Sequence, residues 1–357
     1  ILRELVMNKF RIYDNENTLI MIPGPVLFHP KVLRAMSKPV YGHRTDEFRN
    51  LLNEIETLIK PLFGTKGPVM MLSGSGTMGM DAAIRTFTKP GDKVVCLIAG
   101  KFGERFAEIA NTVGARVVRV DIEWGKAIKP EIVEEVLSKN PDTKIVTFTH
   151  NETSTGVLNP AKDIAKVVKE HGAMLIVDGI TSVGGDFVKM DEWGLDIVIA
   201  GSQKCIGIPP GLAFVALRPE IAEMLREMNG INAYYTNLKV YLDYLEKKGD
   251  LPFTGAVSLF YALYESLKLI HKEGLENRIK RHRLMAKITR EGFRALGLEL
   301  FAEEGYESNT LTAIRYPPTI NDEIFRRKML EHGVLIAGGQ ARLKGKIFRV
   351  AHMNITG

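Results

Sequence analysis

The most informative stretch of this sequence is Asp196-Ile197-Val198-Ile199-Ala200-Gly201-Ser202-Gln203-Lys204. An apolar segment with strong strand preference ends in small polar residues and then presents a single amine. A strand held in a sheet fixes such an amine in place, and partial burial lowers its pKa, so that it can attack a carbonyl carbon. Most lysines that follow strands are solvated loop residues, so a catalytic role for Lys204 depends on whether the rest of the chain supplies a cofactor site around it.

Similar apolar runs recur from residue 69 onward and alternate with amphipathic segments. The expected strands are Val69–Leu72, Val94–Ile98, Val117–Val120, Ile145–Phe148, Met174–Val177 and Ile197–Ala200. The expected helices between them include Phe102–Val113, Pro130–Ser138 and Ala161–His171. Strands that alternate with helices form right-handed crossovers, and continuous apolar runs are typical of strands buried on both faces. The sequence therefore predicts an α/β fold with a mainly parallel, doubly wound sheet.

The alternation fades after the apolar run Ala213–Leu217. Long helices are expected at Val257–Glu273 and Leu275–Leu296, followed by shorter strand signals and one helix near Glu323–Glu331. We therefore expect three parts: an N-terminal arm over residues 1–20, a large domain over residues 21–272 and a small C-terminal α+β domain over residues 273–357.

Composition excludes several classes of function. The 48 Lys and Arg residues exceed the 42 Asp and Glu residues by only 6 in a chain of 357, and they are spread along the sequence. The densest basic cluster has the spacing of an exposed helix face and comprises Arg278, Lys280, Arg281 and Arg283. Nucleic acid is therefore not an expected partner. No apolar run approaches the roughly 20 residues that a membrane span requires, so we expect no membrane partner.

The two cysteines, Cys96 and Cys205, are too few for a disulfide framework. No spacing of cysteine and histidine matches a zinc site, so no metal is expected. These features favour the reducing cytoplasm.

A glycine-rich loop follows the first expected strand and opens a helix. It reads Ser73-Gly74-Ser75-Gly76-Thr77-Met78-Gly79. Backbone N–H groups at such a helix start can hold a phosphate. The spacing of Gly74, Gly76 and Gly79 also matches the dinucleotide pattern, which requires an acid after the next strand, whereas Ala99-Gly100-Lys101 stands there. Phosphate binding is favoured, and a dinucleotide site or a plain tight turn stays open.

Asp178 follows the apolar run Leu175-Ile176-Val177. Alone it is more often a turn or cap residue. However, Asp178, Lys204 and the glycine loop all lie at the carboxyl ends of expected strands, where open α/β sheets bind ligands. A phosphate cradle, a carboxylate and an amine together suit pyridoxal phosphate, since they can anchor its phosphate, keep its pyridine nitrogen protonated and hold its aldehyde.

A series of motifs then extends along almost the whole chain. In order they are Pro23-Gly24-Pro25, Gly42-His43, Ser73 to Gly76, Thr149 to Gly156, Val177-Asp178, Gly201 to Lys204 and Pro209-Pro210-Gly211. Together they resemble the class V aminotransferases of the fold-type I pyridoxal-phosphate enzymes, and among these the serine/alanine–pyruvate/glyoxylate aminotransferases.

The resemblance implies a set of cofactor-binding residues. Lys204 would be the Schiff-base lysine and proton shuttle, and Asp178 would pair with the pyridinium nitrogen. The remaining members would be Ser75, Gly76, Thr77 and Gln203 on the phosphate, Phe102 and Ile180 on the two ring faces, and Thr153 near the phenolic oxygen.

The resemblance also implies substrate-binding residues and a partner. Arg349 would bind the substrate carboxylate, and Tyr41, Gly42 and His43 would form the pocket for the substrate side chain. Thr254 would reach the phosphate of the neighbouring subunit, which implies a homodimer with shared active sites.

The sequence departs from the family pattern in two places. Leu251 stands where the family often has a tyrosine that contacts the phosphate across subunits. The family also continues with a further helix after the expected strand Ile347–Ala351, whereas this chain stops at Gly357, so we expect the small domain to be truncated or to end in a disordered tail.

The predicted reaction is a ping-pong transfer of an amino group from a small L-amino acid, serine or alanine, to a 2-oxo acid, pyruvate or glyoxylate. A related transaminase with another small donor, such as an aminophosphonate, is the nearest alternative. An NAD-dependent oxidoreductase that uses the Gly74-Gly76-Gly79 loop and a cofactor-free binding module are more distant ones. A cysteine desulfurase is disfavoured because Cys96 lies within an expected strand and Cys205 directly follows Lys204.

Overall fold

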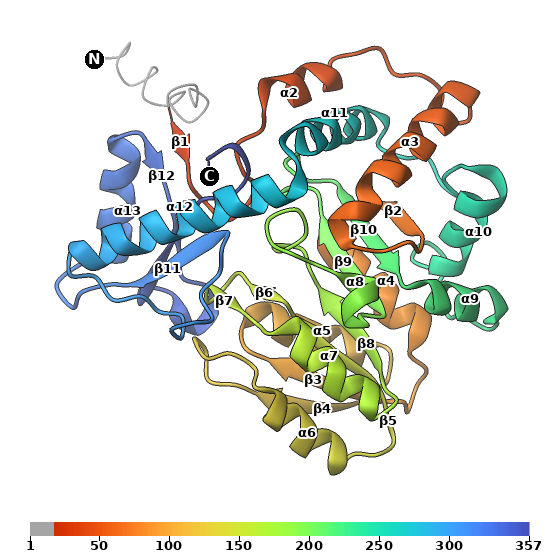
Figure 1. Ribbon diagram of the computed structural model, residues 1–357, viewed down its shortest axis with the longest axis horizontal. Helices are drawn as coiled ribbons and strands as arrows, with labels where there is room; N and C mark the ends of the chain where they lie inside the picture. The colour runs from red at the N-terminus through yellow and green to blue at the C-terminus, as the bar shows by residue number, and fades with distance from the viewer. Residues whose placement is uncertain (1–17, 357) are drawn as a thin grey trace, which may run out of the picture.

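The fold centres on a seven-stranded sheet in a computed structural model that describes residues 18–356 (Figure 1). The strand order is β2-β10-β9-β8-β5-β3-β4. The strands are β2 (Val69–Ser73), β3 (Lys93–Ile98), β4 (Arg116–Asp121), β5 (Thr143–Thr149), β8 (Met174–Asp178), β9 (Ile197–Gly201) and β10 (Leu212–Leu217). Within this sheet, β10 runs antiparallel to both of its neighbours, and the other pairs are parallel. The predicted mainly parallel α/β fold is confirmed.

Helices cover both faces of the sheet, because alternate strand residues point to opposite sides. Val177 and Val198 pack with α3 (Asp46–Phe63), α6 (Pro130–Ser138), α7 (Ala161–Glu170) and α11 (Val257–Glu273). Ile176 and Ile199 pack on the other face with α4 (Gly76–Phe87), α5 (Lys101–Thr112), α9 (Pro219–Glu227) and α10 (Leu238–Lys248). The sheet is thus doubly wound.

The edge strand β4 departs from the expected burial on both faces. Arg116 and Arg119 are exposed in it, and Val118 is only half-buried. The strand pairs with β3 alone and ends the sheet, so charged side chains can remain in solvent.

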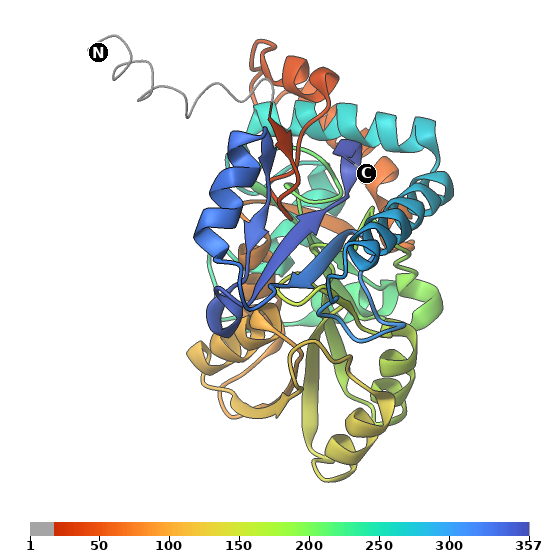
Figure 2. The ribbon, with the colours of Figure 1, turned by 90° about the vertical axis from the view of Figure 1, so that its left-hand side faces the viewer.

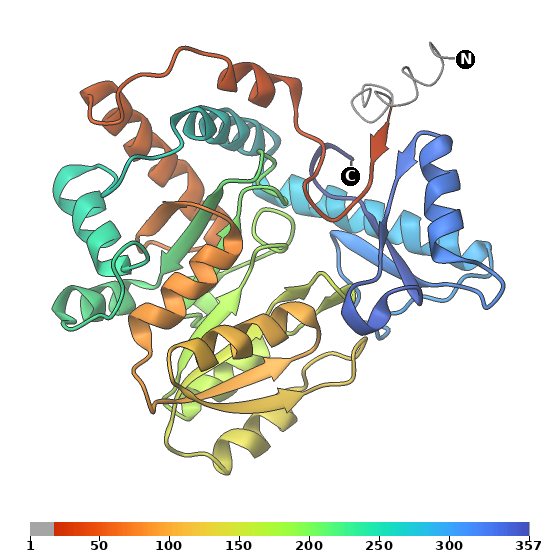
Figure 3. The ribbon, with the colours of Figure 1, turned by 180° about the vertical axis from the view of Figure 1, so that it is seen from behind.

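A second, smaller sheet has the order β11-β14-β13. Its strands are β11 (Leu311–Arg315), β13 (Ala337–Gly338) and β14 (Ile347–Ala351), and α13 (Asp322–Glu331) lies beside it. The long helix α12 (Leu275–Ala295) runs from the end of α11 toward this sheet, which lies to one side of the central sheet (Figures 2 and 3).

The start of the described chain also contacts the C-terminal region. The short strand β1 (Leu19–Ile20) pairs in parallel with β12 (Val334–Leu335). Met21 then accepts a hydrogen bond through its carbonyl from the N–H of Ala351 at 2.7 Å. Part of the predicted N-terminal arm therefore forms a strand against the small sheet region, and residues 1–17 of that arm lie outside the described residues.

The basic cluster on α12 is not simply an exposed face. Arg278 is buried and donates to the carbonyl oxygens of Gly184, at 2.9 Å, and Cys205, at 2.7 Å. It also donates to the Asn354 side chain at 2.9 Å. The expectation of full exposure was wrong for Arg278, because these acceptors replace the water that a buried guanidinium loses.

Candidate active site

A cavity of about 220 Å³ lies at the carboxyl ends of the parallel strands. It is lined by Gly24, Ser75, Gly76, Thr77, Phe102, Arg105, Thr153, Asp178, Ile180, Thr181, Gln203, Lys204 and Gln340. The structure thus brings together the nine residues that the resemblance assigned to the cofactor within one chain. They come from the ends of β2, β8 and β9 and from the segments after β3 and β5, as the parallel topology requires.

Lys204 lies in this cavity and is only 9% exposed. Its Nζ donates a hydrogen bond to the carbonyl oxygen of Pro23. Gly24 follows with a φ of +108°, and a Cβ there would lie 2.8 Å from Nζ, so glycine is required beside the amine. Burial, and next the charge of Arg349, lower the pKa of Lys204 to about 8. The amine therefore has a substantial uncharged, nucleophilic fraction near neutral pH.

Asp178 ends β8 and is buried in the same cavity. Its Oδ1 accepts a hydrogen bond from the N–H of Ile180 at 2.9 Å. Burial raises the pKa of Asp178 to about 7, although the Ile180 N–H acts in the opposite direction. A buried carboxylate with so few donors is stabilised by a cation, and a protonated pyridine nitrogen has the required charge.

The glycine-loop end of the cavity is suited to an anion. Helix α4 begins at Gly76 with Ser75 as its N-cap, so its first N–H groups have no partner within the helix. A Cβ on Gly76 would collide with the side chain of Ile180, so glycine keeps this end open. Gln203 also lines it, and the buried Oε1 of Gln203 has no hydrogen-bond partner within residues 18–356. Rotating that amide by half a turn presents its N–H groups to a phosphate.

Arg105 adds a cation at this end, and the sequence reasoning missed it. Its Nη1 donates to Thr77 Oγ1 at 2.9 Å, and its guanidinium carbon lies 4.8 Å from the centre of the Phe102 ring. The available signal was the spacing, because residues 102 and 105 lie on the same face of a helix. A guanidinium beside a helix start strengthens the case for a bound phosphate.

Glu152 is a second residue that the sequence reasoning missed. It is fully buried and accepts hydrogen bonds from the N–H groups of Phe102 and Gly103, both at 3.1 Å, and from Ser154. Because Gly100 has no side chain to cap α5, Glu152 satisfies the start of that helix and holds Phe102 against the cavity.

Arg349 lies behind the cavity wall and does not line the cavity. It is buried on β14, and its Nη1 donates to the carbonyl of Thr153 at 3.0 Å. Its Nε and Nη2 donate to the carbonyl of Gly338 at 3.0 and 2.8 Å. Three of the five guanidinium N–H groups are thus engaged, and two remain for a carboxylate. Burial lowers the pKa of Arg349 to about 10, which still leaves it charged at neutral pH.

The other predicted substrate and partner residues lie away from this cavity. Tyr41 is 61% exposed, and its N–H donates to the hydroxyl of Tyr261 at 3.0 Å. The His43 ring lies 3.5 Å from Thr254 Oγ1, and Gly42 is exposed between Tyr41 and His43. One chain therefore brings residues 41–43 and Thr254 to a common exposed edge. Leu251, at the departure from the family pattern, is buried in the core.

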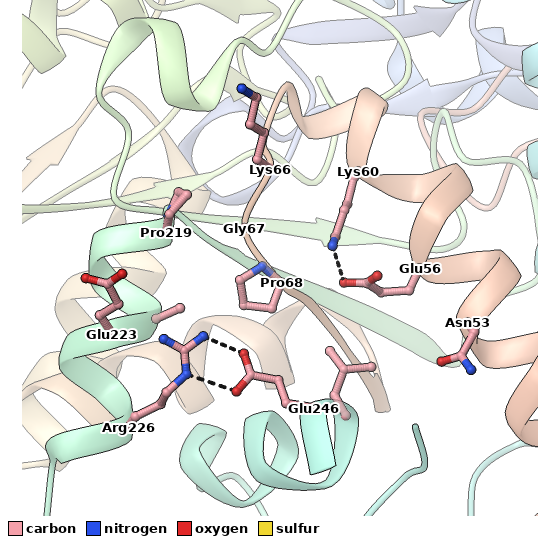
Figure 4. A pocket seen from close by; sticks show the side chains of 12 residues that line it. Asn53, Glu56, Lys60, Lys66, Gly67, Pro68, Pro219, Glu223, Arg226 and Glu246 are labelled. Carbon is pink, nitrogen blue, oxygen red and sulfur yellow. Dashed lines mark hydrogen bonds and ion pairs between the residues drawn. The ribbon is translucent and has the colours of Figure 1, made fainter. Parts of the chain in front are cut away.

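A second hollow, of about 350 Å³, lies at the opposite end of β2, near Gly67 and Pro219 (Figure 4). Its Arg226 pairs with Glu246 and its Lys60 with Glu56. These mutually neutralised groups supply no nucleophile comparable to Lys204.

Three further features of the described residues concern metal ligands, membrane helices and the cysteines. No cluster of potential metal ligands occurs within residues 18–356, and no helix in that range is long and apolar enough to cross a membrane. Both cysteines are buried, and burial raises the thiol pKa to about 11 for Cys96 and about 12 for Cys205, which disfavours a sulfur-accepting thiolate.

The sheet topology argues against the dinucleotide alternative. A dinucleotide unit pairs the strand before the glycine loop with the strand that follows the helix. Here β2 pairs with β10, and β3 lies four strands beyond β10 in the sheet.

Comparisons with known proteins agree with this site. The class V aminotransferase family matches residues 32–349. An uncharacterised aminotransferase of Methanocaldococcus jannaschii is 45% identical over 345 residues, which cover 96% of this chain and 90% of the relative. The serine–glyoxylate aminotransferase of Methylorubrum extorquens is 33% identical, over 94% of this chain and 86% of the relative. The crystal structure of alanine–glyoxylate aminotransferase from Nostoc sp. is 32% identical, matches 95% of this chain and 90% of its own, and has a TM-score of 0.91.

The match spans most of the chain and includes Lys204, Asp178 and the glycine loop of the cavity. The chain therefore belongs to the class V aminotransferases, which are pyridoxal-phosphate enzymes of fold type I.

Proposed function

We propose that this enzyme transfers the amino group of a small L-amino acid, serine or alanine, to glyoxylate or pyruvate in a ping-pong reaction. The observation that carries the proposal is the placement of Lys204 and Asp178 in one cavity with the start of α4. The names of the serine and alanine relatives support the choice of donor, and both name glyoxylate as acceptor.

In this proposal, the cavity residues have three roles: they bind the cofactor and substrate, orient them and transfer a proton. When bound, pyridoxal phosphate supplies an electron sink that acidifies the Cα proton of the amino acid. Lys204 would hold the aldehyde and, once the amino group of the substrate has displaced it, would move that proton, for which its lowered pKa suits it. Asp178 would balance the positive charge of the ring nitrogen, and Ser75, Gly76, Thr77 and Gln203 would hold the phosphate.

The remaining cavity residues orient the ring and the substrate. Phe102 and Ile180 would enclose the two ring faces, and Thr153 would contact the phenolic oxygen. Arg349 would bind the substrate carboxylate with its two free N–H groups, since a planar guanidinium matches a carboxylate.

We also propose a homodimer with shared active sites. Residues 41–43 and Thr254 lie together at an exposed edge, where a second subunit could place its own cavity against them. In that arrangement Thr254 contacts the partner's phosphate, and Tyr41, Gly42 and His43 surround the side chain of the partner's substrate.

The domain limits and the compartment are part of the same proposal. The division into a large domain over residues 21–272 and a small domain over residues 273–357 is supported by the two separate sheets. A cytoplasmic location is supported by the two free cysteines, because oxidising compartments favour disulfides.

Absorbance provides the direct test of the lysine chemistry. The purified protein with pyridoxal phosphate should be yellow, borohydride should remove that absorbance, and Lys204→Ala should lack it. Adding each amino acid of a panel alone should then bleach the band only with true donors. A colourless protein that binds NADH would overturn the proposal in favour of an oxidoreductase.

A further inference from the structure

We propose that Gln340 selects the amino donor by hydrogen bonding to its side chain, so that the enzyme favours the hydroxyl-bearing L-serine over L-alanine. This inference deepens the proposed function and rests on it. Gln340 lies outside all the sequence motifs that carry the family resemblance.

The position of Gln340 in the wall of the cavity is the first argument. Among the cavity-lining residues that the structure describes, Gln340 alone comes from beyond residue 272. Gly24 comes from the N-terminal segment, and the others come from the segments that carry the cofactor-binding residues. Gln340 follows β13 and is therefore the contribution of the C-terminal region to the cavity wall.

The backbone before Gln340 is fixed relative to Arg349. The carbonyl of Gly338 accepts two hydrogen bonds from the Arg349 guanidinium, and the N–H of Gly339 donates to the carbonyl of Ile347 at 2.9 Å. After Gln340, Leu343 is buried against Trp124. The backbone on both sides of Gln340 is thus held in place, and Gln340 itself lines the cavity that contains Lys204.

In the proposed function, two groups of the amino-acid substrate already have binding partners in the protein. Its nitrogen must reach Lys204, and its carboxylate must reach the free N–H groups of Arg349. The third substituent on Cα is the side chain. Gln340 lines the cavity and, unlike Gln203, has no proposed contact with the cofactor, so we assign it to that substituent.

The hydrogen-bonding groups of Gln340 determine which kind of substrate side chain it favours. Its Oε1 is buried and has no hydrogen-bond partner anywhere in the described chain. A buried carbonyl oxygen without a partner is unfavourable, and a ligand that donates to it removes the penalty. The hydroxyl of serine can donate to Oε1, or accept from the amide N–H groups after half a turn. The methyl group of alanine can do neither.

The test compares two donors in matched variants. Gln340→Met keeps an unbranched chain of similar length but removes both hydrogen-bonding atoms. With glyoxylate as acceptor, it should lower kcat/KM for L-serine roughly tenfold, the usual effect of one lost hydrogen bond. The same variant should leave kcat/KM for L-alanine within about twofold. Lys344→Met changes an exposed residue close by in the sequence and should leave both values unchanged.

A binding measurement adds a readout that does not depend on turnover. The analogues 2-methylserine and 2-methylalanine lack the Cα proton and so cannot be transaminated. Gln340→Met should weaken binding of the first by the same factor and leave that of the second unchanged. If Gln340→Met does not fold, Gln340→Asn, which keeps the amide but shortens its reach, should still lower the serine-to-alanine ratio.

The outcomes separate this inference from the function on which it rests. Equal losses for serine and alanine would show that Gln340 supports the site generally, and no loss for serine would show that it does not contact the donor. Either result would overturn the inference while transamination stands. A wild-type protein that converts neither donor would overturn the proposed function and this inference with it.

Discussion

The cavity around Lys204 and the exposed edge around Thr254 differ sharply, although the family resemblance assigns both to one active site. Around Lys204, the reactive groups are buried and their backbone neighbours are fixed by hydrogen bonds. At the other edge, Tyr41 is 61% exposed and His43 contacts Thr254 only at 3.5 Å. In the proposed function, one chain would position the cofactor alone, whereas the edge residues would become part of a site only against a second subunit.

The largest expected effect concerns the buried cavity around Lys204. Asp178→Asn removes the charge that would balance the ring nitrogen but keeps the shape of the side chain. We expect kcat to fall about 10²–10³-fold, in line with the loss of one preorganised electrostatic contact. Stopped-flow half-reactions with saturating donor would measure it, and thermal unfolding would verify the fold. A change of less than tenfold would remove Asp178 from the assigned role.

An intermediate effect is expected for Arg349→Ala, on a strand of the small sheet that contacts the cavity residue Thr153. Loss of the carboxylate partner should raise KM for the amino acid about 30-fold or more, because an unpaired charge costs at least about 2 kcal/mol. The cofactor absorbance should persist, since Arg349 does not line the cavity. Loss of colour in this variant would contradict its assignment to the substrate.

The smallest expected effect is the activity recovered in mixed dimers, which tests whether Thr254 and Lys204 of one chain act in different sites. Thr254→Arg and Lys204→Ala should each be inactive as pure dimers. If Thr254 acts in the partner's site, a hybrid of the two contains one intact site, and coexpression with two affinity tags should recover activity. Hybrids that stay inactive would place Thr254 with its own Lys204. The same hybrid of Lys204→Ala with Asp178→Asn should remain inactive, because both residues belong to one cavity.

The sequence predicted the regular parts of the fold well. Helix α6 begins and ends at the predicted residues, with Pro130 at its first position, where proline is favoured. The strand Met174–Val177 was predicted because a continuous apolar run can be buried on both faces, and β8 extends it by one residue, Asp178. The direction of β10 was not predicted, since an apolar run looks the same in either direction.

The missed residues share a physical reason. Glu152 and Gln340 act through contacts with segments distant in sequence, so no local pattern reveals them. Arg105 contacts the distant Thr77 as well, and its only local signal was the helical spacing from Phe102. Arg278 looked exposed because helical spacing does not show which face another segment will cover. Lys204 and Asp178 could be found because Asp178 ends β8, Lys204 comes shortly after β9, and parallel strands end at one edge.

The pairing of β1 with β12 has a consequence for how the site assembles during synthesis. Leu19 pairs with Val334, so two strands separated by more than three hundred residues must meet. This pairing precedes the segment in which Pro23 accepts a hydrogen bond from Lys204 and Gly24 fits against it. Contacts of such high contact order form late, because a long loop must close first. On the ribosome, the central sheet can form while the chain is still growing, but the N-terminal wall of the lysine site is completed only after the C-terminal region has emerged.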